Sequence, residues 1–300
     1  MEHRQQYGAR PRLACEIMAN GVIAARASVK SSRLELFTSR RLAPGALVPA
    51  LGEPNIQDGE AVRAAISSAM GAVAGKERDA ILIVPDAAIR VLLVDFETLP
   101  TKKQDIDPII RFRLKKSLPF DVDHAAVSSD IRRDNGNIRV VAAVSPRAVM
   151  EDYETAFRDA GYQPGVVLPS SLAALGLVEG TRPTLMLKVD PVNITIVAAQ
   201  NQELRLVRTL ENPQGAEVKA AELAEAVLPS IVFFEDSFSA RIEQICIGGV
   251  AAIDEIGPLL HQQTGAEVRE LAPEISSDQN LSGESIDASM LAGAVGALLG

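Results

Sequence analysis

The densest group of side chains with an evident chemical use lies between residues 111 and 120. It combines four cations with three large apolar side chains. Its members are Arg111, Phe112, Arg113, Lys115, Lys116, Leu118 and Phe120. Such a group could dock an acidic partner segment or an anionic inner leaflet, with the apolar side chains lining a groove for a peptide. The alternatives are a solvated helix face for the cations and ordinary core for the apolar residues.

Several other kinds of site lack the residues that they need. His3, His124 and His261 lie apart from one another and from the two cysteines, so neither a metal site nor a histidine-based triad is supported. Cys15 and Cys246 stand in apolar runs, as small buried side chains do. The sequence contains no Gly-x-Ser-x-Gly elbow, no Gly-x-x-x-x-Gly-Lys-Ser/Thr loop and no dinucleotide fingerprint.

Composition narrows the class of protein. Apolar residues make up 47% of the 300 residues, but aromatic residues only 4%, and Trp is absent, so the cores must be aliphatic. A formal net charge of -9 disfavours nucleic acid as a partner. No run reaches 18 apolar residues, and the polar start of the chain lacks the apolar region of a signal peptide. We therefore expect a cytoplasmic protein.

The first part of the chain reads as hairpin strands followed by helices that alternate with strands. Residues 13 to 29 and 33 to 38 predict strands that turn at Asn20-Gly21 and at Ser31-Ser32. Asp58 is the predicted N-cap of a helix with one apolar face. The face consists of Val62, Ala65, Ile66, Ala69, Met70 and Val73.

Two serines are predicted to begin the later helices of this part. Ser145 precedes Pro146, which suits an N-cap followed by proline at the first helical position, and Ser170 precedes another apolar run. Residues 102 to 117 predict the helix that carries the cations. Short strands are expected at residues 80–84, 91–96, 127–131, 138–144 and 165–168, with a turn at residues 134–136 between the third and fourth.

The same order of elements restarts after a boundary near residues 180–183. Three strands, at residues 184–189, 193–199 and 203–210, precede a long helix over residues 216–234. A short strand at residues 245–247, Gly248-Gly249, a helix over residues 251–263 and a strand at residues 267–271 follow. The chain is therefore a mixed α/β protein in which one pattern occurs twice.

Three segments resemble the type IV pilus assembly proteins called PilM-like. They are Ile81 to Asp86 with Leu93 to Pro100, Ile110 to Phe120, and Val144 to Pro164 with Leu168 to Ala173. The resemblance implies an actin-like (RNase H-like) two-lobed fold with duplicated mixed-sheet halves. It places a first half at residues 1–180, with an inserted subdomain at about 88–142, and a second half at 181–285. A C-terminal helix over 286–300 would pack back on the first half.

In an actin-like protein, two tight turns aim backbone N–H groups at phosphates, a carboxylate in each half holds Mg²⁺ through water, and a Gly pair lies near the adenosine. The resemblance places these turns at Glu16 with Asn20-Gly21 and at Asp190 with Asn193, and the Gly pair at Gly248-Gly249. The Gly expected after each carboxylate is replaced by Met18 and by Val192, and Pro191 lacks an N–H. We expect a vestigial site in which ATP and Mg²⁺ bind poorly, with no metal site and no catalytic residue. Simple hairpin and strand-end turns are the alternative reading.

The resemblance also implies a role. PilM-like proteins are adaptors at the cytoplasmic face of the inner membrane, where they bind the N-terminal tail of a bitopic, PilN-like partner and help to align other proteins of a pilus or type II secretion-like platform. The residues between 110 and 120 would then form the docking surface. The alternatives are an active ATPase or phosphotransferase, which binds Mg-ATP between the lobes, and a self-assembling filament.

Overall fold

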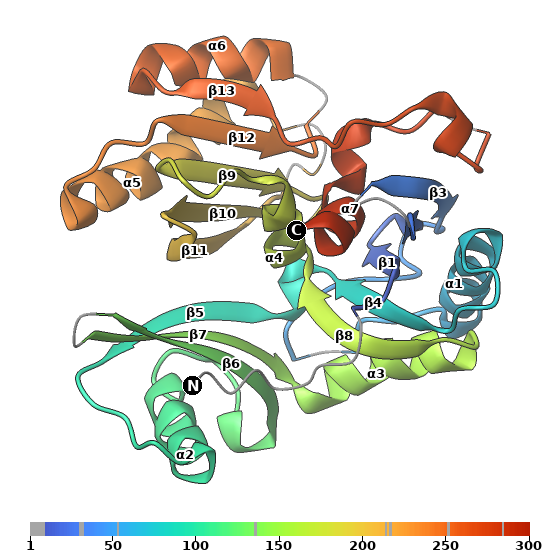
Figure 1. The fold of residues 1–300 in the computed structure, drawn as a ribbon, viewed down its shortest axis with the longest axis horizontal. Coiled ribbons are helices and arrows are strands. Elements are labelled where there is room, and N and C mark those ends of the chain that lie inside the picture. The colour runs from blue at the N-terminus through green and yellow to red at the C-terminus, as the bar shows by residue number, and fades with distance from the viewer. Residues whose placement is uncertain are drawn as a thin grey trace.

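The computed structural model describes residues 10–300 except 30–32, 53, 135–136, 214, 216–217, 251–252 and 284. It contains two five-stranded sheets and one three-stranded sheet, as Figure 1 shows. The turns predicted at Ser31-Ser32 and at Asn135-Gly136 lie outside the described residues. Within the described ranges, no helix is both long and apolar enough to cross a membrane.

The first sheet has the strand order β3-β2-β1-β4-β8. Its strands are β1 (Leu13–Met18), β2 (Gly21–Ala27), β3 (Leu34–Arg41), β4 (Asp79–Val84) and β8 (Gln163–Pro169). The first three form an antiparallel meander, while β4 pairs parallel with both β1 and β8. The central strand β1 is buried on both faces, so its alternate residues contact two different layers.

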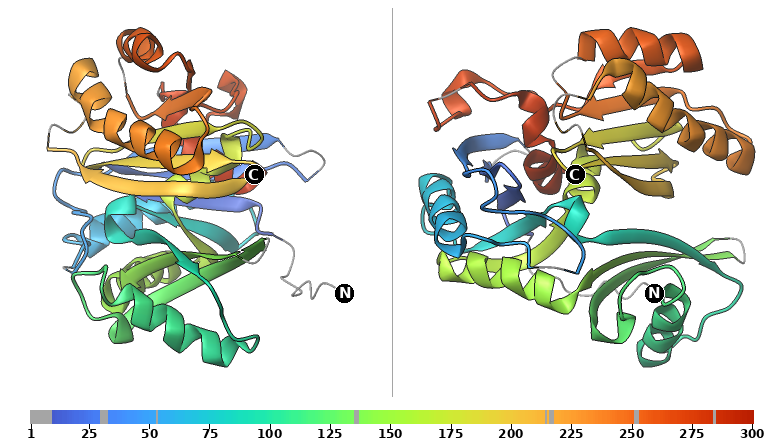
Figure 2. Two further views of the ribbon diagram at one scale, coloured as in Figure 1. Left: turned by 90° about the vertical axis from the view of Figure 1, so that its left-hand side faces the viewer. Right: turned by 180° about the vertical axis from the view of Figure 1, so that it is seen from behind.

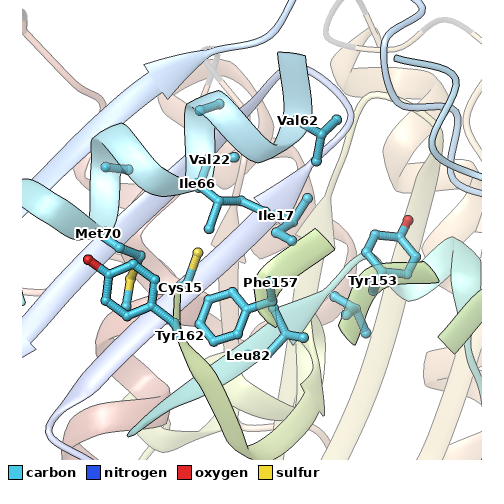
Figure 3. Packing of buried hydrophobic residues seen from close by; sticks show 14 of the residues in the cluster. Cys15, Ile17, Val22, Val62, Ile66, Met70, Leu82, Tyr153, Phe157 and Tyr162 are labelled. Carbon is cyan, nitrogen blue, oxygen red and sulfur yellow. The ribbon is translucent and has the colours of Figure 1, made fainter. Parts of the chain in front are cut away.

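One face of this sheet is covered by α1 (Gly59–Val73) and α3 (Arg147–Asp159). The apolar face predicted for α1 is the buried one, and Asp58 Oδ1 accepts a hydrogen bond from the Ala61 N–H at 2.9 Å. Figure 3 shows how side chains of the sheet, including Cys15 and Ile17, meet those of the two helices. The periodicity of the apolar residues in α1 therefore determines which face of the helix packs on the sheet.

The other face is covered by the end of the chain. Here α7 (Ala292–Leu299) packs against α4 (Ser170–Ala174) and the strands of the first sheet. A short 3₁₀ turn, Ala288–Leu291, precedes α7. Figures 1 and 2 show α4 and α7 between the two five-stranded sheets. The side chains of β1 that point toward this face therefore lie at the junction of the two five-stranded sheets.

The three-stranded sheet is inserted between β4 and α3 and has the order β5-β7-β6. Its strands are β5 (Arg90–Phe96), β6 (Ala125–Asp134) and β7 (Asn137–Pro146). The helix α2 (Lys103–Leu114) buries Ile106, Ile110 and Leu114 in a small core of its own with this sheet. Pro108 is accommodated in the second turn of α2.

The second five-stranded sheet, β11-β10-β9-β12-β13, repeats the order of the first. Its strands are β9 (Thr184–Val189), β10 (Asn193–Gln200), β11 (Glu203–Glu211), β12 (Gln244–Gly248) and β13 (Glu267–Glu270). The helices α5 (Ala220–Phe238) and α6 (Ile253–Thr264) cover its outer face, as Figure 2 shows. Its inner face meets α4 and α7.

Two predicted N-caps are wrong. Pro146 and Pro169 occupy the N-cap positions of α3 and α4, and neither helix has a side-chain cap. Ser145 instead lies at the end of β7 and donates to the Ala88 carbonyl oxygen at 2.8 Å. Ser170 donates to the carboxylate of Glu16. Both hydroxyl groups satisfy acceptors far away in the sequence, which a local pattern cannot show.

Candidate functional site

The ends of β1, β4 and β9 bring four charged side chains together at the junction of the two five-stranded sheets. Glu16 comes from β1, Asp86 follows β4, Lys188 comes from β9 and Asp190 follows it. Glu16 is 0% exposed, Asp86 3% and Lys188 6%. Buried charges are unfavourable unless they are paired, so this cluster must be internally compensated.

Alternation along the strands explains why these side chains face one another. In β1, Cys15 and Ile17 point into the core beneath α1 and α3, which leaves Glu16 on the face that carries α7. In β9, Leu187 and Val189 belong to the core beneath α5 and α6, which leaves Lys188 on the inner face. Each sheet therefore contributes one charged residue to the layer between them.

Lys188 forms the centre of the cluster. Its Nζ lies 2.7 Å from Asp190 Oδ1 and 3.6 Å from Glu16 Oε1. The first contact is a charge-assisted hydrogen bond within the second sheet, and the second crosses to the first sheet. One ammonium group thus links carboxylates of both repeats.

Neutral donors complete the cluster. Glu16 accepts the Ser170 hydroxyl and, at 3.0 Å, the N–H of Ala294 near the start of α7. Asp86 accepts the N–H of Ser171 at 3.0 Å and its hydroxyl at 2.7 Å. The first turn of α4 therefore donates to both carboxylates and the first turn of α7 donates to Glu16, with the backbone N–H groups acting as those at helix N-termini do for anions.

Burial changes the protonation of the cluster. Burial raises the pKa of Glu16 and that of Asp86 above their ordinary values, although Lys188 opposes both shifts. Burial alone would lower the pKa of Lys188, but Asp190, Glu16 and Asp86 together raise it. The ammonium group is therefore charged throughout the neutral range, while the two buried carboxyl groups hold a proton more readily than exposed ones do.

The raised pKa of Glu16 gives stability a pH dependence with a definite sign. In the folded protein this carboxyl binds a proton more tightly than in the unfolded chain, where the ordinary value is 4.5. Its contribution is fully present below that value and is lost as pH rises through the folded pKa. Glu16→Gln has no proton to lose. We expect its free energy of unfolding to rise relative to that of the wild type as the pH is raised above 4.5 and through the raised pKa of the folded carboxyl, measured by urea titration. A difference that does not change with pH would contradict this.

A cavity of about 190 Å³ lies beside the cluster. Lys188, Asp190 and Pro191 line it from the second sheet, and Met18 and Asn20 from the β1–β2 hairpin. On its remaining side are residues of the C-terminal segment and of the turn after β12, namely Asp287, Ser289, Met290 and Gly249. The cavity therefore lies where the two repeats and the C-terminal segment meet.

The residues predicted to bind nucleotide are thus only partly assembled. Glu16 and Asp190 approach one another through Lys188, and Asn20 and Gly249 line the cavity. The other three predicted residues instead make contacts within the protein. Gly21 fits against the Arg40 carbonyl of β3, Asn193 is buried with its amide donating to Thr195 Oγ1 at 3.0 Å, and Gly248 packs against Leu271.

The residues predicted to bind a partner fall into two groups, one exposed and one in contact with other parts of the inserted unit. Phe112 on α2 is 70% exposed, and Arg113 on the same helix and Lys116 in the turn that follows it are exposed as well. The others have contacts within the inserted unit. Arg111 donates to the Val122 carbonyl at 2.6 Å, Lys115 pairs with Asp123 at 2.6 Å, and Leu118 and Phe120 pack on the small core.

Sequence reasoning missed Lys188, Asp86, Ser170, Ser171 and the contact made by Ala294. One signal was present for Lys188, because it is a single charge in a run of buried apolar residues, Leu185 to Val189. A charge at the centre of a buried strand requires a partner. The serines and the Ala294 N–H carry no comparable signal, because their roles depend on contacts across the fold.

Comparisons with known proteins fit this architecture. No family model matches the chain, and no curated protein matches it. The "PilM-PilN type IV pilus biogenesis complex" contains a chain that is 16% identical, with a TM-score of 0.79 over 96% of this chain and 98% of that one. The cytoplasmic domain of EpsL, an inner-membrane component of the type II secretion system of Vibrio cholerae, is 12% identical, with a TM-score of 0.54 over 95% and 94% of the two chains.

The printed description of a third solved structure includes the name of its fold. A Bacteroides thetaiotaomicron protein with an actin-like ATPase fold and unknown function is 9% identical, with a TM-score of 0.50 over 93% of each chain. Its printed description and the repeated mixed sheets agree with the fold expected from the sequence. The comparisons confirm the resemblance to PilM-like proteins and show that this chain has the actin-like fold.

Proposed function

We propose that the chain is an adaptor in the inner-membrane platform of a type IV pilus or of a related type II secretion system. In this role it lies at the cytoplasmic face of the inner membrane and binds the cytoplasmic N-terminal tail of a bitopic, PilN-like protein. One observation carries the proposal, which is the likeness over 96% of the chain to a protein solved as a PilM-PilN complex. The likeness to the EpsL cytoplasmic domain supports the part of the proposal that concerns type II secretion.

Four exposed side chains, in the later part of α2 and in the turn that follows it, form the proposed docking surface. This surface consists of Ile109, Phe112, Arg113 and Lys116, which follow one another at helical spacing. Ile109 is 38% exposed and Phe112 70%, so two large apolar side chains lie in solvent beside two cations. A large exposed aromatic side chain next to Arg is the kind of anchor that dominates protein interfaces. An extended tail with apolar and acidic side chains fits this surface.

A binding measurement tests the proposal. We expect the chain to bind a fluorescent peptide with the sequence of the cytoplasmic N-terminal tail of the PilN-like protein from the same organism. Phe112→Asp removes the apolar anchor and places a negative charge next to the acidic side chains of the tail, so its affinity should be at least about tenfold lower. Fluorescence anisotropy gives the dissociation constants.

Phe233→Asp is the matched control. Phe233 is 53% exposed on α5, on the outer face of the second sheet, and its substitution should leave the affinity unchanged. If folded Phe112→Asp binds as tightly as the wild type, the docking surface lies elsewhere. If the wild type does not bind the tail, the adaptor role is wrong. Phe120→Asp is unsuitable for this test, because Phe120 packs on the core of the inserted unit.

A further inference from the structure

The actin-like fold implies a Mg-nucleotide between its two repeats, and the residues of this chain can be tested against that group. Mg²⁺ usually keeps several of its water ligands, and carboxylates that hold it through those waters must be free to accept hydrogen bonds from them. Here the ammonium group of Lys188 lies 2.7 Å from Asp190 and 3.6 Å from Glu16, the two carboxylates that the resemblance assigns to the metal. Within the residues that the structure describes, no three His, Cys, Asp or Glu side chains are grouped to hold a metal.

Three backbone N–H groups at the junction are also engaged within the protein, those of Gly249, Ala294 and Asp190. The Gly249 N–H donates to Ser289 Oγ at 3.2 Å, and the Ala294 N–H donates to Glu16. The Asp190 N–H donates to the Asn193 carbonyl oxygen at 2.8 Å, and Pro191 has no N–H. A phosphate group would need such donors to be aimed at open space, because binding a dianion rests on charge-assisted hydrogen bonds.

The available space gives the same result. The cavity beside Asp190 and Gly249 measures about 190 Å³. Pockets that bury most of a drug-sized ligand have volumes of about 300–1,000 Å³. The residues present therefore do not fit Mg-ATP in charge, donors or volume.

We propose that the Lys188 ammonium group is the built-in cation of this junction and that it holds the two repeats together in place of a metal–nucleotide complex. Lys188 belongs to β9 of the second sheet, and it reaches Glu16 in β1 of the first. Its hydrogen bond to Asp190 fixes the ammonium group from its own sheet. The charged side chains of the protein itself then determine how the two repeats are placed relative to one another. Nucleotide does not change this placement. The inference rests on the actin-like fold and on these contacts, and it does not require the partner proposed above.

The wild-type protein provides the first test. Its thermal midpoint should be the same in EDTA, in MgCl₂ and in Mg-ATP. A ligand at about 100 times its Kd would raise the midpoint of a protein of this size by roughly 5–10 °C. A saturable increase with Mg-ATP, or heat of Mg-ATP binding in calorimetry with a Kd below about 1 mM, would overturn the proposal.

Lys188→Met provides the second test, with Lys76→Met as the control. Methionine keeps the length of the side chain but leaves Glu16 and Asp190 without their cation, so the midpoint should fall by roughly 5–10 °C at neutral pH. Lys76 is exposed, and its substitution should change the midpoint by no more than about 1 °C. The double variant Lys188→Met with Glu16→Gln should recover part of the loss. A single Lys188→Met variant as stable as the wild type would refute the proposal.

The two proposals fail separately. Absence of tail binding by the wild type would contradict the adaptor role and leave these thermal midpoints unaffected. If Lys188→Met does not fold, the measurements on the wild type with EDTA, MgCl₂ and Mg-ATP still decide the question.

Discussion

Gly249→Ala is expected to lower the free energy of unfolding by about 3 kcal/mol or more. Gly249 has a φ of +82°, and a Cβ atom there would lie 1.9 Å from the carbonyl oxygen of Val189. The left-handed conformation costs an L-residue about 1–2 kcal/mol, and forced contact in a packed region adds about 1–3 kcal/mol. The strand β9 would have to move, and with it the link between Lys188 and Glu16. Urea titration followed by circular dichroism measures the loss.

Gly265→Ala separates these two causes. Gly265 has a φ of +73°, but a Cβ atom there would meet nothing within 4 Å. This variant should lose only the conformational part, about 1–2 kcal/mol. Equal losses for the two variants would show that contact with Val189 does not matter and that the turn after β12 has room to relax.

Phe157→Ala should cost about 3–5 kcal/mol, since it empties the centre of the core beneath the first sheet. Phe157 is 0% exposed on α3, and its ring lies 5.8 Å from that of Tyr162. Figure 3 shows it among Cys15, Leu82 and Tyr162. The truncation removes apolar contacts and leaves a cavity, because the sheet and two helices prevent collapse.

Phe112→Ala is the counterpart at the surface. Phe112 is 70% exposed, so its truncation should change the free energy of unfolding by no more than about 0.5 kcal/mol. Both values come from urea titrations at the same pH. A large loss for Phe112→Ala would mean that α2 packs against something through this side chain, which would weaken the case for a docking surface there.

The parts of the fold that local patterns determine were predictable. The apolar spacing of α1 and the N-cap at Asp58 agree with the structure, as do the strand meander and the repeated order of elements. These features arise within a few residues of one another, or from a period that a single element carries. The resemblance added the arrangement of the two repeats, which no local pattern contains.

The candidate site was predictable only where the resemblance, or a residue type unusual in its own segment, indicated it. The resemblance led to Glu16 and Asp190, and Lys188, which lies outside the family pattern, could have been found as a charge within an apolar strand. Ser170 could not be assigned, because a serine before an apolar run satisfies the pattern of a helix cap whether or not it caps. Its actual acceptor, Glu16, is brought near by the pairing of β1 with β4 and of β4 with β8.

The cation-rich helix α2 shows a limit to how well the charge of a surface can be predicted from the sequence. Arg111 and Lys115 read as members of one positive group, yet each has an acceptor in the segment that follows α2. The direction of a long side chain depends on what the chain does after the helix ends, so charge counted along a helix overstates the charge that the helix presents.

The hydrogen bond from the Ala294 N–H to Glu16 has a consequence for biosynthesis. The two residues are 278 positions apart, and a ribosome adds about 5–20 residues per second. For at least about 14 s after β1 is made, therefore, the growing chain lacks the segment that covers Glu16 and this face of β1. The first repeat reaches its final packing only after α7 has left the exit tunnel, and until then the apolar side chains that α7 covers are the kind of surface that chaperones protect.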